Sequence, residues 1–347
     1  MTIWTSNKGE WSEAYVLLKL LVDPALVASD SQLNPVDGRY YLVKQIIWRS
    51  KDEERSLTPK AKAYSSESDP SKSVTLDEIR EALPQILMAI SQGERAFPMP
   101  IVQDIYQRMG LASFKMSSTK KIDISLVIPS MGGVQDRELG FSIKSQLGSN
   151  STLLNASSTT NIRYTVQGEE ARQALGSEGL GHYRTNLDAI RANSGNLEFD
   201  EFESDTFSAN LRNFSSDFPE FYAEMVRTYV TGESSTRNIN ELTTVSSNSS
   251  SEVNQRSYQV KAFLRAVALG LVPGSEWSGK LAGYGGYIVV KRTGELVCLH
   301  LDNDDDFKDY LFENTAFDIP KNDLFQSPKI IDDELKIFLN AQIRFTS

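Results

Sequence analysis

The fold of this chain is decided by two neighbouring stretches, KIDISLVI at residues 121–128 and GFSIKSQLGSN at residues 140–150. Apolar and polar side chains alternate along both, and this period of two predicts β-strands whose successive side chains point to opposite faces. The polar side of the first stretch includes Asp123, and that of the second includes Lys144. Each strand can therefore cover a core with one face while its other face carries polar groups.

The second stretch raises the question of why a strand that looks buried carries a lysine. Ser142, Lys144 and Gln146 share one face of it, and the apolar residues between them take the other. If the two strands are neighbours in one sheet, their polar faces meet and Asp123 comes close to Lys144. The alternative is an edge strand whose lysine lies in solvent.

The surrounding segments predict a mixture of helices and strands. Helical periodicity or capping patterns predict helices at residues 9–22, 73–90, 100–111, 168–175, 184–193, 206–231 and 255–270. The second of these has a capping box formed by Thr75 and Glu78 and contains Pro84, where we expect a kink. Further strands are expected at 39–48 and 160–166, together with a late hairpin that turns at RTGE, whereas TTVSSNSSSE at 243–252 is expected to be a loop. This order predicts an α+β or mixed α/β fold, a central mixed β-sheet flanked by helices, rather than a doubly wound parallel sheet.

Three regions are expected along the chain. Residues 1–110 form a mainly helical region that contributes to the core, 111–240 hold the core sheet with its helices, and 241–347 hold a helix and the late hairpin. The third region is the expected DNA-contacting part if the protein binds DNA. The three regions can also form one compact domain.

Composition limits the chemistry. The 347 residues carry a net charge of −10, no stretch approaches the roughly 18 uninterrupted apolar residues of a membrane span, and the first residues lack the pattern of a signal peptide. The single cysteine, Cys298, excludes an intrachain disulfide and favours a reducing, cytoplasmic setting. With only His182 and His300 as imidazoles, a metal would need oxygen ligands, as Mg²⁺ does.

An aspartate and a lysine on adjacent strands suit metal-assisted hydrolysis of a phosphodiester. The aspartate holds the metal, and the lysine orients a water and stabilises the charge that grows on the phosphate. A second carboxylate would usually stand two residues before the lysine, where this chain has Ser142. Gln146 could replace its oxygen, or Glu10 or Glu13 could, since these two lie on one face of the first helix. We favour Glu13 as the second metal ligand.

The spacing of Asp123 and the triplet Ser142-Ile143-Lys144 resembles the PD-(D/E)XK nuclease superfamily. More specifically, NKGEWSEAYVLLKLL, GFSIKSQLGSNSTLLNAS, GGYIVVKRTGELVCLHL, YLFENTAFDIP and LNAQIRF are similar to the HpaII family of type II restriction endonucleases. This resemblance runs from about residue 7 to the C-terminus. It implies a nuclease-like core with helical additions, and Mg²⁺-dependent cleavage of double-stranded DNA at CCGG, between the two cytosines.

Carried over by position, Asp123 would bind the metal, Lys144 would be the catalytic lysine, and Gln146 and Ser142 would be polar groups of the active site. The chain departs from the superfamily pattern in two places: Ile122 stands where a proline is usual, and Ser142 stands where an acid is usual. The second departure puts the identity of the second metal ligand in question.

Other polar residues are candidates for DNA contacts. In the segment SNSTLLNAS, Ser149 and Asn155 can bind phosphates, which position a protein on DNA without reading its sequence. Arg184 can donate to guanine, the commonest base-specific contact. The alternatives are an ordinary polar connection and a surface arginine near a helix start.

We consider three functions. The first is a site-specific nuclease that uses Asp123, Lys144 and Mg²⁺ on a short palindromic site in duplex DNA, with a homodimer on DNA as the default and a monomer as the alternative. The second is a DNA-binding or repair protein of the same fold with altered catalysis, which the missing acid at Ser142 motivates. The third is an α+β interaction protein whose lysine is simply solvated.

Overall fold

The computed structural model describes residues 3–49, 53–66, 71–113, 122–129, 135–148, 150–176, 179–280, 284–320 and 326–346. The chain forms two compact units, which are treated separately here. Unit 1 comprises Met1–Ser151 and Leu281–Tyr310, and unit 2 comprises Thr152–Lys280 and Leu311–Ser347.

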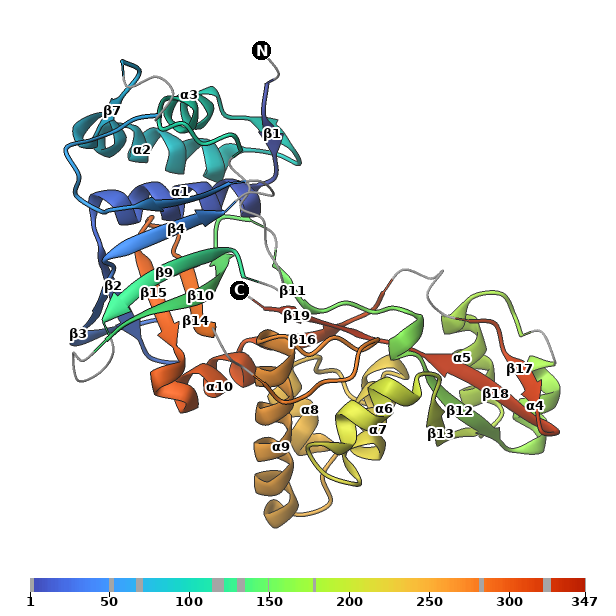
Figure 1. Ribbon diagram of the computed structural model, residues 1–347. Helices are drawn as coiled ribbons and strands as arrows, with labels where there is room; N and C mark the ends of the chain where they lie inside the picture. The colour runs from blue at the N-terminus through green and yellow to red at the C-terminus, as the bar shows by residue number, and fades with distance from the viewer. Residues whose placement is uncertain are drawn as a thin grey trace. The chain divides into compact units, whose positions relative to one another are not determined.

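An eight-stranded mixed sheet forms the centre of unit 1 (Figure 1). Its order is β3-β2-β15-β14-β10-β9-β4-β5, and the pairs β10–β14 and β15–β2 are parallel while the other pairs are antiparallel. The strands are β2 (Ala25–Ser29), β3 (Pro35–Leu42), β4 (Gln45–Arg49), β5 (Glu54–Leu57), β9 (Ile124–Pro129), β10 (Asp136–Ser145), β14 (Tyr284–Val290) and β15 (Leu296–His300). This confirms the central mixed sheet that the sequence predicts.

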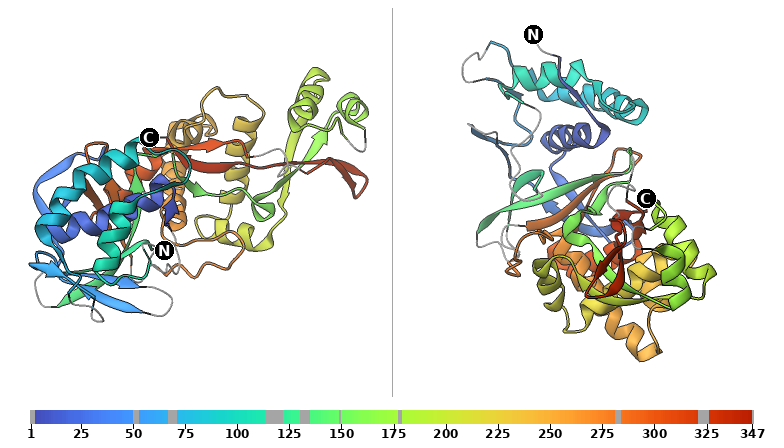
Figure 2. Two further views of the ribbon diagram at one scale, coloured as in Figure 1. Left: turned by 90° about the horizontal axis from the view of Figure 1, so that it is seen from above. Right: turned by 90° about the vertical axis from the view of Figure 1, so that its right-hand side faces the viewer.

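Three helices cover one side of this sheet: α1 (Lys8–Val22), α2 (Leu76–Gln92) and α3 (Pro100–Arg108). Figures 1 and 2 show α1 between the strands and the pair formed by α2 and α3. Because α1 is enclosed on both sides, nine of its 15 residues are buried, and Trp11 contributes to a core that also includes Trp48 and Phe141. Two short strand pairs, β1 (Thr5–Ser6) with β8 (Phe97–Pro98) and β6 (Ala63–Tyr64) with β7 (Val74–Thr75), complete this part.

The helix starts follow local capping chemistry. Asn7 and Glu10 form a capping box at the start of α1, and Thr75 and Glu78 form the predicted one at the start of α2. α2 continues through Pro84 as one helix. The hairpin β14–β15 turns at RTGE as predicted, with the Lys291 N–H donating to the Glu295 carbonyl over 2.9 Å.

Unit 2 contains two smaller antiparallel sheets. One has the order β11-β19-β16 and the other β13-β12-β18-β17. Their strands are β11 (Thr152–Leu154), β12 (Ile162–Gln167), β13 (Asn196–Phe202), β16 (Thr315–Asp318), β17 (Lys329–Ile331), β18 (Glu334–Leu339) and β19 (Gln342–Phe345).

The helices of unit 2 are α4 (Glu169–Leu175), α5 (Tyr183–Ala192), α6 (Asp205–Arg212), α7 (Phe218–Val230), α8 (Ile239–Val245) and α9 (Ser250–Ala268). Helix α10 (Asp304–Glu313) begins in unit 1 and ends in unit 2, and short 3₁₀ turns occupy Ser158–Thr160 and Leu301–Asn303. None of the helices in these described stretches is long and apolar enough to cross a membrane.

Three sequence expectations are wrong in detail. The strand expected at 39–48 is the end of β3 and the start of β4, which lie apart in the sheet because the chain turns at Val43, whose N–H donates to Pro24. The strand expected at 160–166 is confirmed as β12, which pairs with β13 and β18 in unit 2.

The other two corrections concern helices. The helix expected at 206–231 is two helices, since Pro219 lacks an N–H and is tolerated only in the first turn of α7. The loop expected at 243–252 contains the end of α8 and the start of α9, where the Ser249 hydroxyl accepts a hydrogen bond from the Glu252 N–H.

Candidate active site

The Asp123 carboxylate is fixed to the backbone of β10. Asp123 lies immediately before β9, and its own N–H donates to the Phe141 carbonyl over 2.9 Å. Its Oδ2 accepts a hydrogen bond from the Ile143 N–H over 2.7 Å. Since Phe141 is paired with Ile124, the next antiparallel pair along the register brings Asp123 opposite Ser142. Asp123 therefore lies on the same face of the sheet as Ser142 and the residue two further on.

Lys144 lies on this face, beside an aromatic ring. The parallel register of β10 and β14 aligns Ser142 with Tyr287 and Lys144 with Val289. The Lys144 Nζ lies 4.9 Å from the centroid of the Tyr287 ring, a cation–π distance. The Tyr287 ring is buried and packs edge-on against Phe307 of α10, with 5.0 Å between the centroids. The lysine amine therefore lies over a well-packed aromatic ring, on the same face of the sheet as Asp123.

The N-terminal part of α1 supplies a second acidic residue. The Ser12 hydroxyl donates to the Ser145 hydroxyl over 2.8 Å, which fixes this part of α1 to the end of β10. Burial lowers the pKa of the Lys144 amine, and the negative charge of the neighbouring Glu13 is one of the two charges that partly oppose this effect. Glu10 instead takes part in the helix cap, where its carboxylate accepts from the Asn7 N–H. Of the two glutamates that the sequence offers, Glu13 is thus the one whose charge reaches Lys144.

Burial and charge oppose each other at this site. Burial lowers the pKa of Lys144, and the nearby Asp123 and Glu13 counteract part of that effect. Burial also raises the pKa of Asp123, against the Ile143 N–H and the charge of Lys144. Both groups are therefore poorly hydrated, the environment in which a lysine amine interacts most strongly with an anionic ligand.

The oxygen groups around Asp123 suit a hard cation. No cluster of three or more histidine, cysteine, aspartate or glutamate side chains occurs among the residues that the structure describes. Mg²⁺ commonly uses only one or two carboxylates and completes its shell with water and phosphate oxygens. Asp123, whose hydrogen bond to Ile143 engages Oδ2, is one such carboxylate, and Glu13 is the candidate for a second.

The other predicted site residues are distributed over both units. Ser142 is buried on the face of Lys144, and Gln146 follows the end of β10, with its N–H donating to the Val290 carbonyl over 3.0 Å. Asn155 and Arg184 belong to unit 2 and are exposed, and the Arg184 Nε donates to the Tyr183 hydroxyl over 2.8 Å. Ser149 lies outside the described residues.

Sequence reasoning missed Tyr287, although a signal for its strand is present. The two glycines before it allow close contacts: a Cβ at Gly285 would meet the Phe141 ring at 2.3 Å, and one at Gly286 would meet the Leu299 carbonyl oxygen at 2.0 Å. Gly286 also has a φ of +131°, which other residues rarely adopt. Gly285 and Gly286 therefore mark a tightly packed strand.

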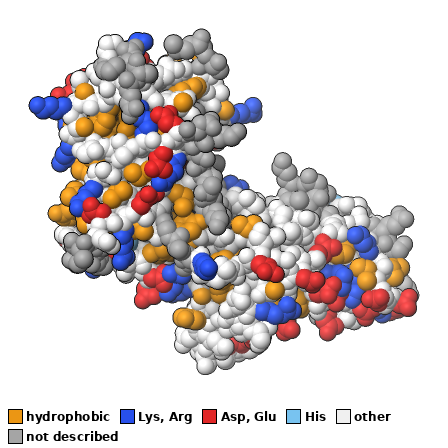
Figure 3. Space-filling model, in the orientation of Figure 1, with side chains coloured by type: hydrophobic (Ala, Val, Ile, Leu, Met, Phe, Trp, Pro, Cys, Tyr) orange, Lys and Arg blue, Asp and Glu red, His pale blue; other side chains and the backbone are white. Residues whose placement is uncertain are grey.

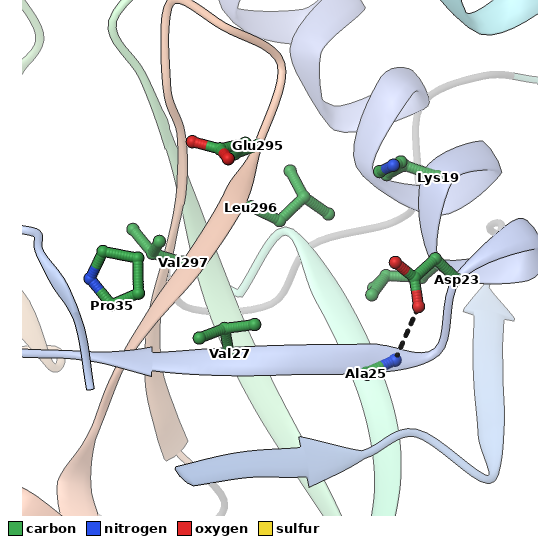
Figure 4. A pocket seen from close by; sticks show the side chains of 9 residues that line it. Lys19, Asp23, Ala25, Val27, Pro35, Glu295, Leu296 and Val297 are labelled. Carbon is green, nitrogen blue, oxygen red and sulfur yellow. Dashed lines mark hydrogen bonds between the residues drawn. The ribbon is translucent and has the colours of Figure 1, made fainter. Parts of the chain in front are cut away.

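A pocket of about 310 Å³ elsewhere in unit 1 contains none of the predicted site residues (Figure 4). Its wall includes Lys19 and Asp23 near the end of α1, Val27 of β2 and Glu295 of the hairpin, and the Asp23 carboxylate accepts from the Ala25 N–H. On the face seen in Figure 3, acidic and basic side chains are interspersed. The Lys144 centre is thus distinguished by the charges, burial and packing of its residues.

Comparison with known proteins gives this geometry its context. Residues 7–345 match the family model described as HpaII restriction endonuclease. The chain is 35% identical to the type II restriction enzyme HpaII of Haemophilus parainfluenzae over 354 aligned positions, which cover 99% of each protein. No solved structure matches the chain.

These matches define a restriction endonuclease, a site-specific deoxyribonuclease that acts on DNA. The chain belongs to the HpaII restriction endonuclease family.

Proposed function

We propose that this type II enzyme cleaves double-stranded DNA at CCGG, between the two cytosines, in a Mg²⁺-dependent reaction at the Asp123–Lys144 centre. The observation that carries the proposal is the pairing of Asp123, bonded to the Ile143 N–H, with the half-buried Lys144 beside it. The CCGG site is supported by family resemblance and by the 35% identity to the enzyme from Haemophilus parainfluenzae.

In this mechanism Asp123 and Glu13 would hold the metal. Bound Mg²⁺ would polarise the scissile phosphate and favour formation of hydroxide from a water. Lys144 orients the attacking water and stabilises negative charge on the phosphate oxygens, and the packed ring of Tyr287 fixes the amine for both tasks. Ser142 and Gln146 supply uncharged polar groups to the same face, and Ser149, Asn155 and Arg184 remain proposed DNA contacts.

The proposed assembly is a homodimer on DNA, because a palindromic site presents the same contacts to two symmetry-related subunits. A monomer that cuts each strand in turn is the alternative. The proposed location is the cytoplasm, where restriction enzymes meet incoming DNA.

The direct test is digestion of a plasmid with several CCGG sites, in Mg²⁺ and in EDTA, with sequencing of the fragment ends. We expect discrete fragments that end between the cytosines, and none in EDTA. Lys144→Ala should lower the cleavage rate at least about 10³-fold, as loss of a group that stabilises the transition state does. Lys19→Ala, in the last turn of α1, is the matched control and should cut normally. Fragments with other ends would reject CCGG, and normal cutting by Lys144→Ala would reject the catalytic centre.

A second candidate function is a DNA-binding protein with altered catalysis, because the buried Ser142 stands where an acid is usual in this nuclease pattern. It predicts retention of CCGG duplexes in a gel without cleavage at any Mg²⁺ concentration. Glu13→Gln separates the two functions: if Glu13 replaces the missing acid, this change should raise the Mg²⁺ concentration for half-maximal cleavage. An unchanged Mg²⁺ dependence would remove Glu13 from the metal site.

A further inference from the structure

Helix α9 of unit 2 buries side chains only in its second half. Its buried residues lie between Gln259 and Ala268, and none of the residues 250–258 is buried. A helix in a protein gains most of its stability from packing one face against the core. The first half of α9, roughly two and a half turns long, therefore lies on the surface of unit 2 and is held there by other contacts.

Arg256 fixes one side of this half-helix. Its Nη2 donates to the Asp217 carboxylate over 2.9 Å and to that of Glu252, one turn earlier, over 3.2 Å. The guanidinium carbon lies 4.5 Å from the centroid of the Phe221 ring, and the side chain is only 11% exposed. Because Asp217 immediately precedes α7 and Phe221 lies within it, this side of α9 is attached to α7.

The opposite side of the half-helix presents four uncharged residues with polar groups to solvent. They are spaced by three or four positions and so share one face: Ser251, Asn254, Gln255 and Tyr258. All four are exposed, and Tyr258 is 74% exposed. None of their side chains forms a hydrogen bond or an ion pair with a residue of the described stretches. The donors and acceptors of this face are therefore open to a ligand.

The charge of α9 is positive, although the chain as a whole has a net charge of −10. The helix contains three basic residues, Arg256, Lys261 and Arg265, and one acid, Glu252. Lys261 and Arg265 continue the face of Tyr258 at helical spacing, whereas Glu252 binds Arg256 on another side. A face with polar and basic residues and no acid attracts a polyanion, so charge complementarity favours the DNA on which this family acts.

Other helices of unit 2 have a different surface. Glu169 and Arg172 of α4 form an acid–base pair with 3.1 Å between the charged atoms, and Asp188 and Arg191 of α5 form one with 3.7 Å. In Figure 3 the lower part of the molecule, where α9 lies, is largely white, whereas red and blue side chains gather over β12 and β18. The uncharged face of α9 is thus a distinct feature of the surface of unit 2.

We propose that this face of α9 lies in the major groove of the target duplex, where Asn254 and Gln255 contact base edges and Tyr258 contacts a phosphate. The inference rests on the proposed function, which supplies the duplex and its CCGG site. A side-chain amide has donors for guanine O6 or N7 and an acceptor for the cytosine N4 amine. A tyrosine hydroxyl is among the groups that bind phosphate and position a protein on DNA.

The dimensions of the half-helix fit the groove. At 1.5 Å per residue, the stretch from Ser251 to Tyr258 is about 10 Å long, and the major groove is about 12 Å wide and admits an α-helix. Base pairs are spaced by about 3.4 Å, so the stretch covers about three of them. Recognition helices contact bases with their N-terminal residues, and in α9 the N-terminal half is the one that lies outside the core.

The test is binding of the full chain to fluorescent duplexes that differ only in the site, CCGG or TTAA, with Ca²⁺ replacing Mg²⁺. Asn254→Ala and Gln255→Ala should each weaken binding to CCGG by about 5- to 150-fold and change binding to TTAA by less than about 3-fold. Tyr258→Phe should weaken both by about 2- to 10-fold, because a phosphate contact does not depend on sequence. Alanine is the strongest helix former, so the alanine variants should keep their Tm.

Gln173→Ala is the matched control. Gln173 is an exposed glutamine of α4 that donates to Glu169 over 2.9 Å, and its loss should leave the affinity for both duplexes unchanged. A second pair of variants tests the face through charge. Gln255→Glu keeps the shape of the side chain but adds a negative charge, so it should weaken binding to both duplexes, and Gln173→Glu should not.

The outcomes separate this inference from the proposed function. Losses confined to CCGG in the alanine variants support base contacts by α9. Equal losses on both duplexes would assign Asn254 and Gln255 to phosphates, and unchanged binding by these variants and by Gln255→Glu would place the face away from DNA. Either result, with a wild type that cuts CCGG, overturns the inference alone. A wild-type protein that neither prefers nor cuts CCGG would refute the proposed function itself.

Discussion

At the scale of single residues, the centre depends on how Lys144 is held. A lysine amine on a flexible stem loses much freedom when it is fixed, and here it contacts the ring of Tyr287 while the charges of Asp123 and Glu13 act on it. The alternation of the sequence is sufficient to predict that Asp123 and Lys144 share a face. The contribution of Tyr287 is not predictable in this way, because it depends on which distant strand pairs with β10 in parallel.

Removing the Tyr287 ring should slow the chemical step. A cation–π contact of about 0.5–2 kcal/mol corresponds to roughly a 2- to 30-fold lower kcat for Tyr287→Leu, with KM little changed. Tyr287→Phe keeps the ring and should retain kcat within about 2-fold. Steady-state kinetics on a CCGG duplex, with Tm measured for both variants, checks this. Equal kcat for Tyr287→Leu and wild type would show that the ring has no role in positioning the amine.

His300 should make the stability of unit 1 depend on pH. Its ring is buried, stacks on Tyr41 at 4.2 Å, and its Nδ1 accepts from the Asp302 N–H. Burial lowers the pKa of His300 below 6.5, and Asp302 offsets only part of this. The unfolded chain then binds the proton more readily, so the stabilisation is complete above 6.5 and is lost as the pH falls through the folded pKa.

His300→Asn keeps an acceptor near Asp302 but cannot be protonated in this range. We expect its Tm to fall less than that of the wild type between about pH 7.5 and pH 5.5. Thermal unfolding is measured for both proteins at both pH values. Because the two proteins share every other titrating group, the difference between them isolates the effect of His300. Identical pH dependence in the two proteins would mean that His300 titrates alike in the folded and unfolded chain.

At the scale of elements, polar junctions decide where strands begin and end. The fully buried Asn340 lies between β18 and β19, and its amide donates to the Ser157 carbonyl and to Asn161 and accepts from Thr160. It joins this junction to the 3₁₀ turn before β12. Such a network depends on residues about 180 positions apart, so sequence patterns alone could not predict it.

Asn340→Ala should destabilise unit 2 by about 2–4 kcal/mol, because it leaves several buried polar groups without partners. The matched control, Asn196→Ala at the exposed start of β13, should change the free energy of unfolding by less than about 0.5 kcal/mol. Urea unfolding followed by circular dichroism measures both. A loss below 1 kcal/mol for Asn340→Ala would show that the junction rearranges or admits water.

Helix and strand predictions succeeded where local signals dominate. The start of α2 follows from Thr75 and Glu78, and the β14–β15 turn follows from RTGE. Local signals do not identify the partners of a strand: the pattern at 160–166 predicts β12, but not its pairing with β13 and β18 in unit 2. The polar segment around Ser249 resembles a loop in composition, yet its serine caps α9.

At the scale of the whole molecule, the chain interleaves its two units. It leaves unit 1 after Ser151, returns at Leu281 and leaves again after Tyr310, so the sheet with Lys144 and the sheets of unit 2 are built from alternating stretches. Sequence patterns do not reveal this interleaving, because strand partners distant in the chain define it. The three regions expected from the sequence therefore remain a prediction about which parts of the chain carry which function. They do not describe the two compact units.

The number of chains on DNA is a prediction at this scale. Each chain has a mass of 38.8 kDa, and sedimentation with a CCGG duplex in Ca²⁺ should show two chains on one duplex. A duplex with the site scrambled is the control and should give no defined complex. One chain per cognate duplex would replace the homodimer with sequential cutting by a monomer.

The central claim is that Asp123 binds the metal that drives cleavage. The measurement that tests it most directly is single-turnover cleavage of a CCGG duplex by Asp123→Asn and wild type, with binding measured in Ca²⁺. We predict that Asp123→Asn, which keeps the acceptor for the Ile143 N–H, cleaves at least about 10³-fold more slowly at every Mg²⁺ concentration while remaining folded. Cleavage by Asp123→Asn at the wild-type rate would contradict the account.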